Sequence, residues 1–420
     1  MRAKRAKGGG LLALGRGRVS GPLKVWVLVV VGFGLVMVYS ASSVLSLGNY
    51  GTSTVYFTGQ LTRALIGFAA MIVVAALDYR IWERLAKPLL WLSVLALLLL
   101  AIPVATPYTP ELNGSRRWIV LPGFHFQPLA AAGLALIVWM SATIVRKGDR
   151  LDRFSDGLAP LLVVPALMAL LLLFQPDFKG ASLLLAVAFT MLYLGGVRLR
   201  YLVGMVAAVV PVLAVVLVLE PYRLRRLASF VDPGHDLEGI SYQIHQSLIS
   251  LGSGGWLGVG LGQSKQKFAF LPAAYNDFIF SIIGEELGMV GTLFVLGAFL
   301  YFGWIGYGIA RRAPDGFGFL LASGVTTQIV MSALVNLGVA TAILPTTGLT
   351  LPFISYGGTD LIVRLVMVGI LLSVSRDAVD HVHVGQGDGR RRRGGAQAVR
   401  PRPAWWRRLT GRRMRLGESR

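Results

Sequence analysis

Long apolar segments recur along this chain of 420 residues, and they constrain its fold more than any other feature. Each spans roughly 20 residues, the length at which a helix crosses a bilayer. The strands of a membrane barrel would instead alternate apolar and polar residues over shorter segments. Charged residues make up 15% of the chain, against about 25% in soluble proteins. The sequence therefore predicts an all-α polytopic membrane protein.

We expect about ten transmembrane helices within a membrane domain at 22–375, with a large extracytoplasmic loop, 220–277, between the seventh and the eighth. The expected helices cover residues 23–47, 61–77, 88–103, 128–145, 160–174, 181–196, 201–219, 278–310, 317–337 and 361–374. The eighth is long enough to be tilted or broken near Gly288. A basic N-terminal tail (1–21) precedes the domain. An Arg-rich C-terminal tail (376–420) follows it and is expected to be disordered, because its Gly, Pro and Arg content cannot bury a core.

The distribution of Lys and Arg among the loops predicts the orientation of the chain. With the N-terminus inside, the loops after the second, fourth, sixth and eighth helices are basic, and so is the C-terminal tail. Cytoplasmic loops carry such an excess of Lys and Arg. Both termini are therefore expected to be cytoplasmic.

The charge and the absence of cysteine exclude several function classes. The net charge of +21 comes largely from the two tails, and basic tails beside a membrane favour anionic lipids over nucleic acid as partners. The chain has no cysteine and 5 scattered histidines. Thiolate chemistry is therefore excluded, and a dedicated metal site is not expected.

Several cations depart from the expected orientation because they lie on the outer side. They include Arg116, Arg117, Lys265 and Lys267. Long loops escape the charge rule, so these residues could simply be tolerated there. The alternative is a cationic site for an anionic ligand such as a phosphate.

Four acidic residues lie at or near the outer ends of predicted helices. Asp277 ends the large loop, where it could either perform chemistry or cap the next helix. Asp177, in the turn Gln175-Pro176-Asp177, is better explained as a cap. Glu285 and Glu286 could be buried structural residues or functional ones. A glycine-rich turn at 351–359, which contains Ser355 and Tyr356, precedes the last helix and permits an unwound backbone.

Several of these residues belong to longer motifs distributed from the first helix to the last. They are VMVYSASS (36–43), GSRRWI (114–119), FQP (126–128), QPDF (175–178), YQIHQSL (242–248), GSGGWLGVGLGQSKQKFAFLP (252–272), NDFIFSIIGEELG (276–288) and LPTTGLTLPFISYGG (344–358). In these motifs the chain resembles the SEDS family (shape, elongation, division and sporulation). The resemblance is greatest to its division branch, FtsW, and smaller to RodA.

The resemblance implies a peptidoglycan glycosyltransferase that polymerises lipid II at the outer face of the bacterial cytoplasmic membrane. It implies a class B penicillin-binding protein and other division membrane proteins as partners. The family's catalytic acid corresponds to Asp277. Arg116, Arg117, Lys265 and Lys267 are the candidates for pyrophosphate binding, with Asp177, Glu285, Glu286, Ser355 and Tyr356 in supporting roles. No protein-made metal site is implied, and the need for a divalent cation such as magnesium or manganese is left open.

The chain departs from the family pattern at three places. Ala130 and Gly133 stand where the pattern QPSELAK has an acid and a lysine, and Lys179 stands where glycine is usual. The LPEAHTDF pattern becomes LPAAYNDF at 271–278, with Asn276 in place of Thr. Loss of an acid together with a lysine is charge-neutral, as expected if they paired with each other.

Two other functions remain as alternatives at this stage. A lipid II flippase fits the helix count, although transporters bind near the membrane midplane, whereas Asp277 and the outer cations lie on one face. A catalytically silent scaffold for cell division fits the missing acid and lysine, whereas the presence of Asp277 argues against it.

Overall fold

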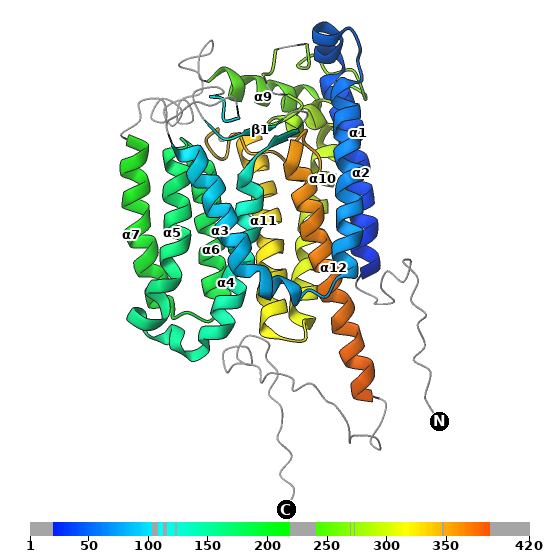
Figure 1. The fold of residues 1–420 in the computed structure, drawn as a ribbon. Coiled ribbons are helices and arrows are strands. Elements are labelled where there is room, and N and C mark those ends of the chain that lie inside the picture. The colour runs from blue at the N-terminus through cyan, green and yellow to red at the C-terminus, as the bar shows by residue number, and fades with distance from the viewer. Residues whose placement is uncertain are drawn as a thin grey trace, which may run out of the picture.

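The computed structural model describes residues 20–102, 108–111, 116–121, 124–218, 241–268, 270–272, 274–346 and 348–386. These residues form a bundle of helices that run roughly side by side (Figure 1). The helices are α1 (Ser20–Tyr50), α2 (Val55–Ala76), α3 (Ile81–Ala101), α4 (Pro128–Lys147), α5 (Ala159–Phe174), α6 (Phe178–Leu194), α7 (Leu199–Val218), α9 (Tyr242–Ser253), α10 (Ile279–Arg312), α11 (Gly316–Ala340) and α12 (Gly358–Gln386). Two short turns, η1 (Gly148–Asp152) and η2 (Phe154–Leu158), join α4 to α5.

Nine helices in the described part of the chain are long and apolar enough to cross a membrane. The remaining predicted segment corresponds to α6, an apolar helix of 17 residues. The predicted all-α polytopic membrane fold is therefore confirmed. The only strands in the described ranges, β1 (Ile119–Leu121) and β2 (Phe124–Phe126), pair antiparallel as a short hairpin just before α4.

The hairpin and α9 lie at one end of the bundle, which we call the loop end (Figure 1). Helix α1 begins, and α12 ends, at the opposite end (Figure 1). Ser20 and Gln386, where the described part of the chain begins and ends, therefore lie at the same end of the bundle.

The helices differ greatly in how much of their apolar surface the bundle buries. In α11, 78% of the most apolar window is buried, against 6% in α7. An apolar helix that the protein leaves uncovered is typical of contact with lipid. The central helices α4, α11 and α12 are therefore the ones that can enclose a site.

Several predicted boundaries are wrong. Helix α2 begins at Val55 rather than at residue 61, α3 begins at Ile81 rather than at residue 88, and α12 continues to Gln386 through the predicted tail boundary at 376. The segment 220–277, predicted as a loop, contains α9. Hydropathy locates the apolar centre of a helix, whereas backbone hydrogen bonding extends the helix into polar flanks. Residues 1–19, 219–240 and 387–420, which include most of the two predicted tails and part of the large loop, lie outside the described residues.

Helix α10 is broken at Gly288, as predicted, where φ is +64°. A break leaves backbone groups that need new partners inside a membrane protein. The glycine-rich segment 254–260 provides them through four hydrogen bonds: Val259 N to Glu285 O (2.9 Å), Gly260 N to Glu286 O (3.1 Å), Met289 N to Gly255 O (2.9 Å) and Val290 N to Trp256 O (3.2 Å). Segment 254–260 thus replaces the missing helical turn.

The close approach explains why this segment is rich in glycine. Gly258 has φ +82°, and a Cβ added to it would collide with the backbone of Glu286. Most residues with a side chain avoid such a positive φ. The segment that the sequence analysis compared with the SEDS family is therefore first of all a structural element.

Candidate active site

Asp277 lies at the loop end, in the turn just before α10, and its side chain is half-buried. Asn336, on α11, donates its amide to the Asp277 carbonyl (2.8 Å) and also to the Leu349 carbonyl. One buried amide thus joins two loops that are distant in sequence. The N-cap residue of α10 is Phe278, with no side-chain capping bond, so the alternative that Asp277 caps this helix is not supported.

The turn 351–356 packs against the Asp277 turn through two residues that the sequence analysis selected. The Ser355 hydroxyl donates to the Asn276 carbonyl (2.6 Å) and accepts from the Leu351 amide (2.8 Å). The Tyr356 amide donates to the Tyr275 carbonyl (3.1 Å), and the two rings are 5.8 Å apart. Burial raises the pKa of the Tyr275 phenol, which therefore stays neutral. Ser355 and Tyr356 hold the turn in place.

The Asp277 carboxylate and the Lys179 amine approach the same glycine. Lys179, in the first turn of α6, donates to the Gly348 carbonyl. A methyl group added to Gly348 would lie 3.0 Å from Asp277 Oδ2 and 3.2 Å from Lys179 Nζ. Gly348 has φ +67°. An acid, an amine and a backbone carbonyl thus meet where a larger residue would not fit.

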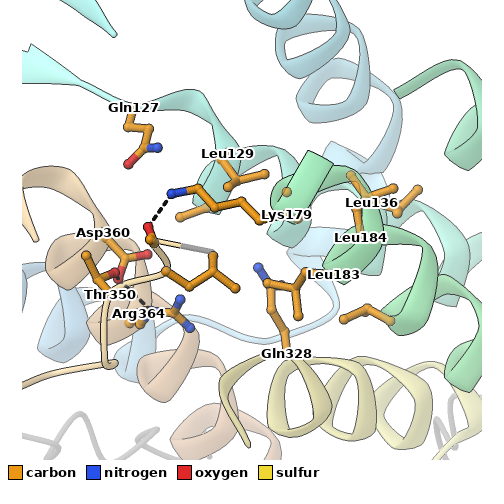
Figure 2. Close-up of a pocket in the computed structure, with 16 residues that line it drawn as sticks. Gln127, Leu129, Leu136, Lys179, Leu183, Leu184, Gln328, Thr350, Asp360 and Arg364 are labelled. Atoms are coloured by element: carbon orange, nitrogen blue, oxygen red, sulfur yellow. Dashed lines mark hydrogen bonds and ion pairs between the residues drawn. The ribbon is translucent and has the colours of Figure 1, made fainter. Parts of the chain in front are cut away.

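Lys179 and Gly348 line a cavity between α4, α6, α11 and α12, which we call the polar cavity. Leucines from α4 and α6 form one side of it, while its polar lining consists of Gln127, Lys179, Gln328, Thr350, Asp360 and Arg364 (Figure 2). Asp277 itself is not a lining residue; its carboxylate lies beside Gly348, which is. Gly348 therefore connects the Asp277 carboxylate to a cavity enclosed by α4, α6, α11 and α12.

Two polar side chains in the cavity have atoms without a partner among the described residues. Arg364 is 4% exposed and donates from Nε to Asp360 Oδ2 (2.7 Å), whereas its Nη1 is unpaired. Gln328 is 5% exposed, and its Oε1 is also unpaired. A buried polar atom without a partner is costly. Such atoms mark a place for a ligand or for water.

The two predicted arginines lie at the loop end but do not line the cavity. Arg116 pairs with Glu111 (3.2 Å) and donates to the Ile102 carbonyl. Arg117 donates to the carbonyl of Pro176, in the turn just before α6. Asp177 accepts from the Gly180 amide (3.1 Å) as the N-cap of α6, so the favoured capping role of Asp177 is confirmed.

Glu285 and Glu286 form a second polar cluster, the glutamate network, which does not line the polar cavity. Glu285 accepts from the Ser250 hydroxyl (3.1 Å), the Ser264 hydroxyl (2.5 Å) and the Lys265 amide (2.8 Å). Glu286 accepts from the Ser40 hydroxyl with both oxygens (2.6 and 2.7 Å) and from the Ser264 amide (3.4 Å). The network fastens the glycine-rich segment to α1, α9 and α10, which favours the structural alternative for both glutamates.

The two predicted lysines of the glycine-rich segment divide between surface and interior. Lys267 is 8% exposed, and its amine lies 3.7 Å from Glu286 Oε1 and donates to the Gly262 carbonyl. Lys265 is exposed, and its backbone amide is the group that joins the network. Neither side chain lines the polar cavity.

A family comparison identifies the chain. The model of the cell cycle protein family that comprises FtsW, RodA and SpoVE matches residues 22–379. The chain belongs to this family. Its predicted membership is therefore confirmed, and the match covers every described helix that contributes to the site.

Individual relatives agree with this assignment. The chain is 41% identical over 353 residues to a probable peptidoglycan glycosyltransferase FtsW of Trichlorobacter lovleyi, covering 84% of this chain and 92% of the relative. It is 43% identical over 343 residues to the protein of the same name in Geobacter metallireducens, covering 82% of this chain and 91% of that one. Both relatives are named FtsW, which is the branch of the family that the sequence motifs favoured.

Solved structures share the fold. A chain of a peptidoglycan synthase complex, studied for its coordination of polymerisation and crosslinking, matches with a TM-score of 0.68 at 29% identity, covering 85% of this chain and 98% of that one. The rod-shape-determining protein RodA of Thermus thermophilus matches with a TM-score of 0.63 at 28% identity, covering 85% and 96%.

Three of the residues that depart from the SEDS pattern line the polar cavity. Ala130 and Gly133 on α4 both line it, as does Lys179 on α6. The sequence marks these three residues as departures but does not show that they lie together. Asn336, Gln328 and the Asp360–Arg364 pair were not among the predicted site residues, although charged or amide side chains inside apolar helices are a signal for function.

Proposed function

We propose that this chain is a peptidoglycan glycosyltransferase of the FtsW type, which polymerises lipid II into glycan strands during cell division. Asp277 is the proposed catalytic base. The observation that carries the proposal is the position of the Asp277 carboxylate, which Gly348 and Lys179 place beside a cavity that enters the bundle from the loop end.

The proposed reaction is a glycosyl transfer with inversion at the donor sugar. The Asp277 carboxylate accepts the proton of the acceptor 4-hydroxyl, whose oxygen then bonds to the anomeric carbon of the donor. The bond from that carbon to the diphosphate breaks, and undecaprenyl pyrophosphate leaves with the electron pair. A positioned general base contributes about 10²–10⁴ to the rate.

The leaving diphosphate needs cations, because charge develops on it in the transition state. Of the predicted outer cations, Arg117 remains a candidate, because it donates to the turn that precedes α6. Lys179, whose amine lies in the cavity, joins it on structural grounds. Lys267 is better explained by its buried pair with Glu286.

The loop end is the proposed extracytoplasmic side, with both termini in the cytoplasm and the chain in the bacterial cytoplasmic membrane. This orientation is supported by the excess of Lys and Arg in the loops assigned to the inside. The proposed partners are a class B penicillin-binding protein, other division membrane proteins and membrane lipids. The match to a peptidoglycan synthase complex supports the first of them.

In the described ranges, no group of three or more histidine, aspartate or glutamate side chains could hold an ion. Whether magnesium or manganese is required stays a prediction for an assay with and without a chelator.

The test is glycan synthesis from purified lipid II by the full chain, bound to its penicillin-binding partner. Wild type is compared with Asp277→Asn, a change that removes the base but keeps the shape. We expect polymer from wild type and at least a hundredfold less from the variant. Equal polymer from both would exclude Asp277 as the base.

The same preparations separate the alternatives. A flippase would translocate labelled lipid II across the membrane of a vesicle without extending it, and a scaffold would bind its partner and do neither. The position of Asp277 at the loop end, instead of mid-bundle, supports glycosyl transfer over transport.

A further inference from the structure

The polar cavity contains more buried charge than the proposed base requires. Arg364 and Asp360 are one helical turn apart on α12 and form an ion pair whose side chains are 5% and 13% exposed. Both lie inside a segment that is otherwise apolar enough to cross a membrane. Charged groups in such a position are expensive, and they are kept when they pair or bind a ligand.

The pairing of Arg364 is incomplete. Its Nε donates to Asp360 Oδ2, whereas its Nη1 is buried without a partner among the described residues. Asp360 is better satisfied, because Oδ2 also faces the Thr350 hydroxyl (3.4 Å). A guanidinium with an unused donor, held by a carboxylate, is oriented to receive a second anion.

A second cation reaches the same cavity. Figure 2 shows the Lys179 amine at the Gly348 carbonyl, with the Asp360 and Arg364 side chains on the same side of the cavity and Gln328 extending towards it from α11. Two cations, one oriented acid and an amide therefore line one space. Such a set suits a phosphate or diphosphate ester, whose oxygens accept from several donors at once.

The cavity also contains the positions where the SEDS pattern has an acid and a lysine. Ala130 and Gly133, on α4, line it together with the α12 pair. A Cβ added to Gly133 would collide with the Gln328 side chain, so this amide now occupies the space that a side chain at 133 would need. The charged pair is absent from α4, while another pair is present on α12 in the same cavity.

We propose that Arg364, oriented by Asp360 and assisted by Lys179, binds the diphosphate of the lipid-linked substrate. The pair on α12 thereby supplies to this cavity the charges that the SEDS pattern places on α4. The proposal rests on the proposed function for the identity of its ligand. It adds the residues that hold the anionic end of the substrate while Asp277 faces the acceptor sugar.

The test measures binding, so that it does not depend on turnover. The probe is undecaprenyl diphosphate, with uncharged undecaprenol as the second ligand, titrated into the full chain in lipid nanodiscs. We expect Arg364→Met to weaken binding of the diphosphate at least about tenfold, because a charge-assisted hydrogen bond is lost. Binding of undecaprenol is expected to stay unchanged.

Two further variants keep the test decisive. Asp360→Asn combined with Arg364→Met avoids leaving an uncompensated buried acid, in case the single variant does not fold. Arg198→Met is the matched control, because Arg198 also pairs with an aspartate, Asp152 (3.0 Å), but outside the cavity. The control is expected to bind both ligands like wild type.

The proposal that the α12 pair replaces a charged pair on α4 is tested by placing an acid and a lysine on α4. Ala130→Glu and Gly133→Lys, added to the double variant together with Gln328→Ala to clear the space, are expected to restore most of the diphosphate affinity. Unchanged diphosphate binding in the folded double variant would overturn the proposal, and so would an equal loss for undecaprenol. If the acid and lysine at positions 130 and 133 did not restore diphosphate affinity, the proposal that the α12 pair replaces an α4 pair would be overturned.

The outcome is separable from that of the proposed function. Arg364-dependent binding of the diphosphate in a protein that makes no polymer would contradict glycosyl transfer and support the subsite. If the Arg364→Met variant formed polymer and bound the diphosphate with full affinity, the proposed diphosphate site would be contradicted, while the proposed function would stand.

Discussion

The glutamate network and the polar cavity both contain charged side chains near the loop end, but they differ in how completely their polar atoms are paired. All four carboxylate oxygens of Glu285 and Glu286 accept hydrogen bonds or pair with Lys267. In the polar cavity, Arg364 and Gln328 retain buried atoms without partners. A saturated cluster can only hold the fold, whereas an unsaturated one has donors left for a ligand.

Two glycines, Gly258 beside the glutamate network and Gly348 in the polar cavity, also differ in what surrounds them. Gly258 is required because backbone from α10 approaches it, whereas Gly348 is required because the charged side chains of Asp277 and Lys179 do. Position in a conspicuous motif therefore does not separate structure from function in this chain. The identity of the neighbouring atoms does.

The largest expected loss of stability follows from opening the glutamate network. Glu286→Gln leaves the buried Lys267 amine without its carboxylate, which should cost about 3–5 kcal/mol of unfolding free energy. Thermal unfolding in nanodiscs measures it. Adding Lys267→Met to the same protein should recover most of the loss, and a lack of recovery would show that the ion pair is not the cause.

A somewhat smaller effect is expected where the glycine-rich segment meets the break in α10. Gly258→Ala brings a Cβ against the Glu286 backbone at a positive φ, which should cost about 2–3 kcal/mol. Gly262→Ala is the matched control, because its φ is +78° but no atom lies within 4 Å of the added Cβ. Equal losses from the two would mean that strain alone, not the close approach, requires glycine at 258.

Gly348→Ala separates stability from activity. We expect a strain cost of about 1–2 kcal/mol but more than a tenfold loss of polymerisation by the folded protein, because the new methyl displaces Asp277 or Lys179. Gly51→Ala has a similar φ, +72°, with open space around it. It should show the strain without the loss of activity, and a parallel loss in both would argue against a special role for Gly348.

The smallest expected effect is the loss of a helix cap. Asp177→Ala removes the acceptor for the Gly180 amide and should destabilise by about 1 kcal/mol. Asp177→Ser, which retains a capping oxygen, should restore most of it. A large activity loss at unchanged stability in the alanine variant would instead assign Asp177 to the site.

The sequence was sufficient to predict the membrane fold and the break at Gly288, since run length and glycine content report these directly. The motifs, read through family resemblance, were sufficient to select Asp277. Arg364 follows Asp360 by one turn in an apolar segment, a spacing that predicts an ion pair. The sequence does not show which cavity that pair lines, because this depends on how α4, α6, α11 and α12 pack.

The roles of the two lysines at 265 and 267 could not be read from their positions either. Both lie in a segment predicted to be outside, where exposure to substrate is the ordinary expectation. Only the fold reveals that Lys267 turns inward to Glu286, and that Lys179, more distant in sequence, reaches Gly348, which the Asp277 carboxylate also approaches.

The most direct test compares Asp277→Asn with Glu286→Gln in one experiment that measures both unfolding temperature and polymer formed per folded molecule. The account predicts that Asp277→Asn keeps or raises the unfolding temperature while its activity falls at least a hundredfold. It predicts that Glu286→Gln lowers the unfolding temperature while its folded fraction stays active. The reverse pattern, with a stable but inactive Glu286→Gln or an active Asp277→Asn, would contradict the assignment of chemistry to the polar cavity and of structure to the glutamate network.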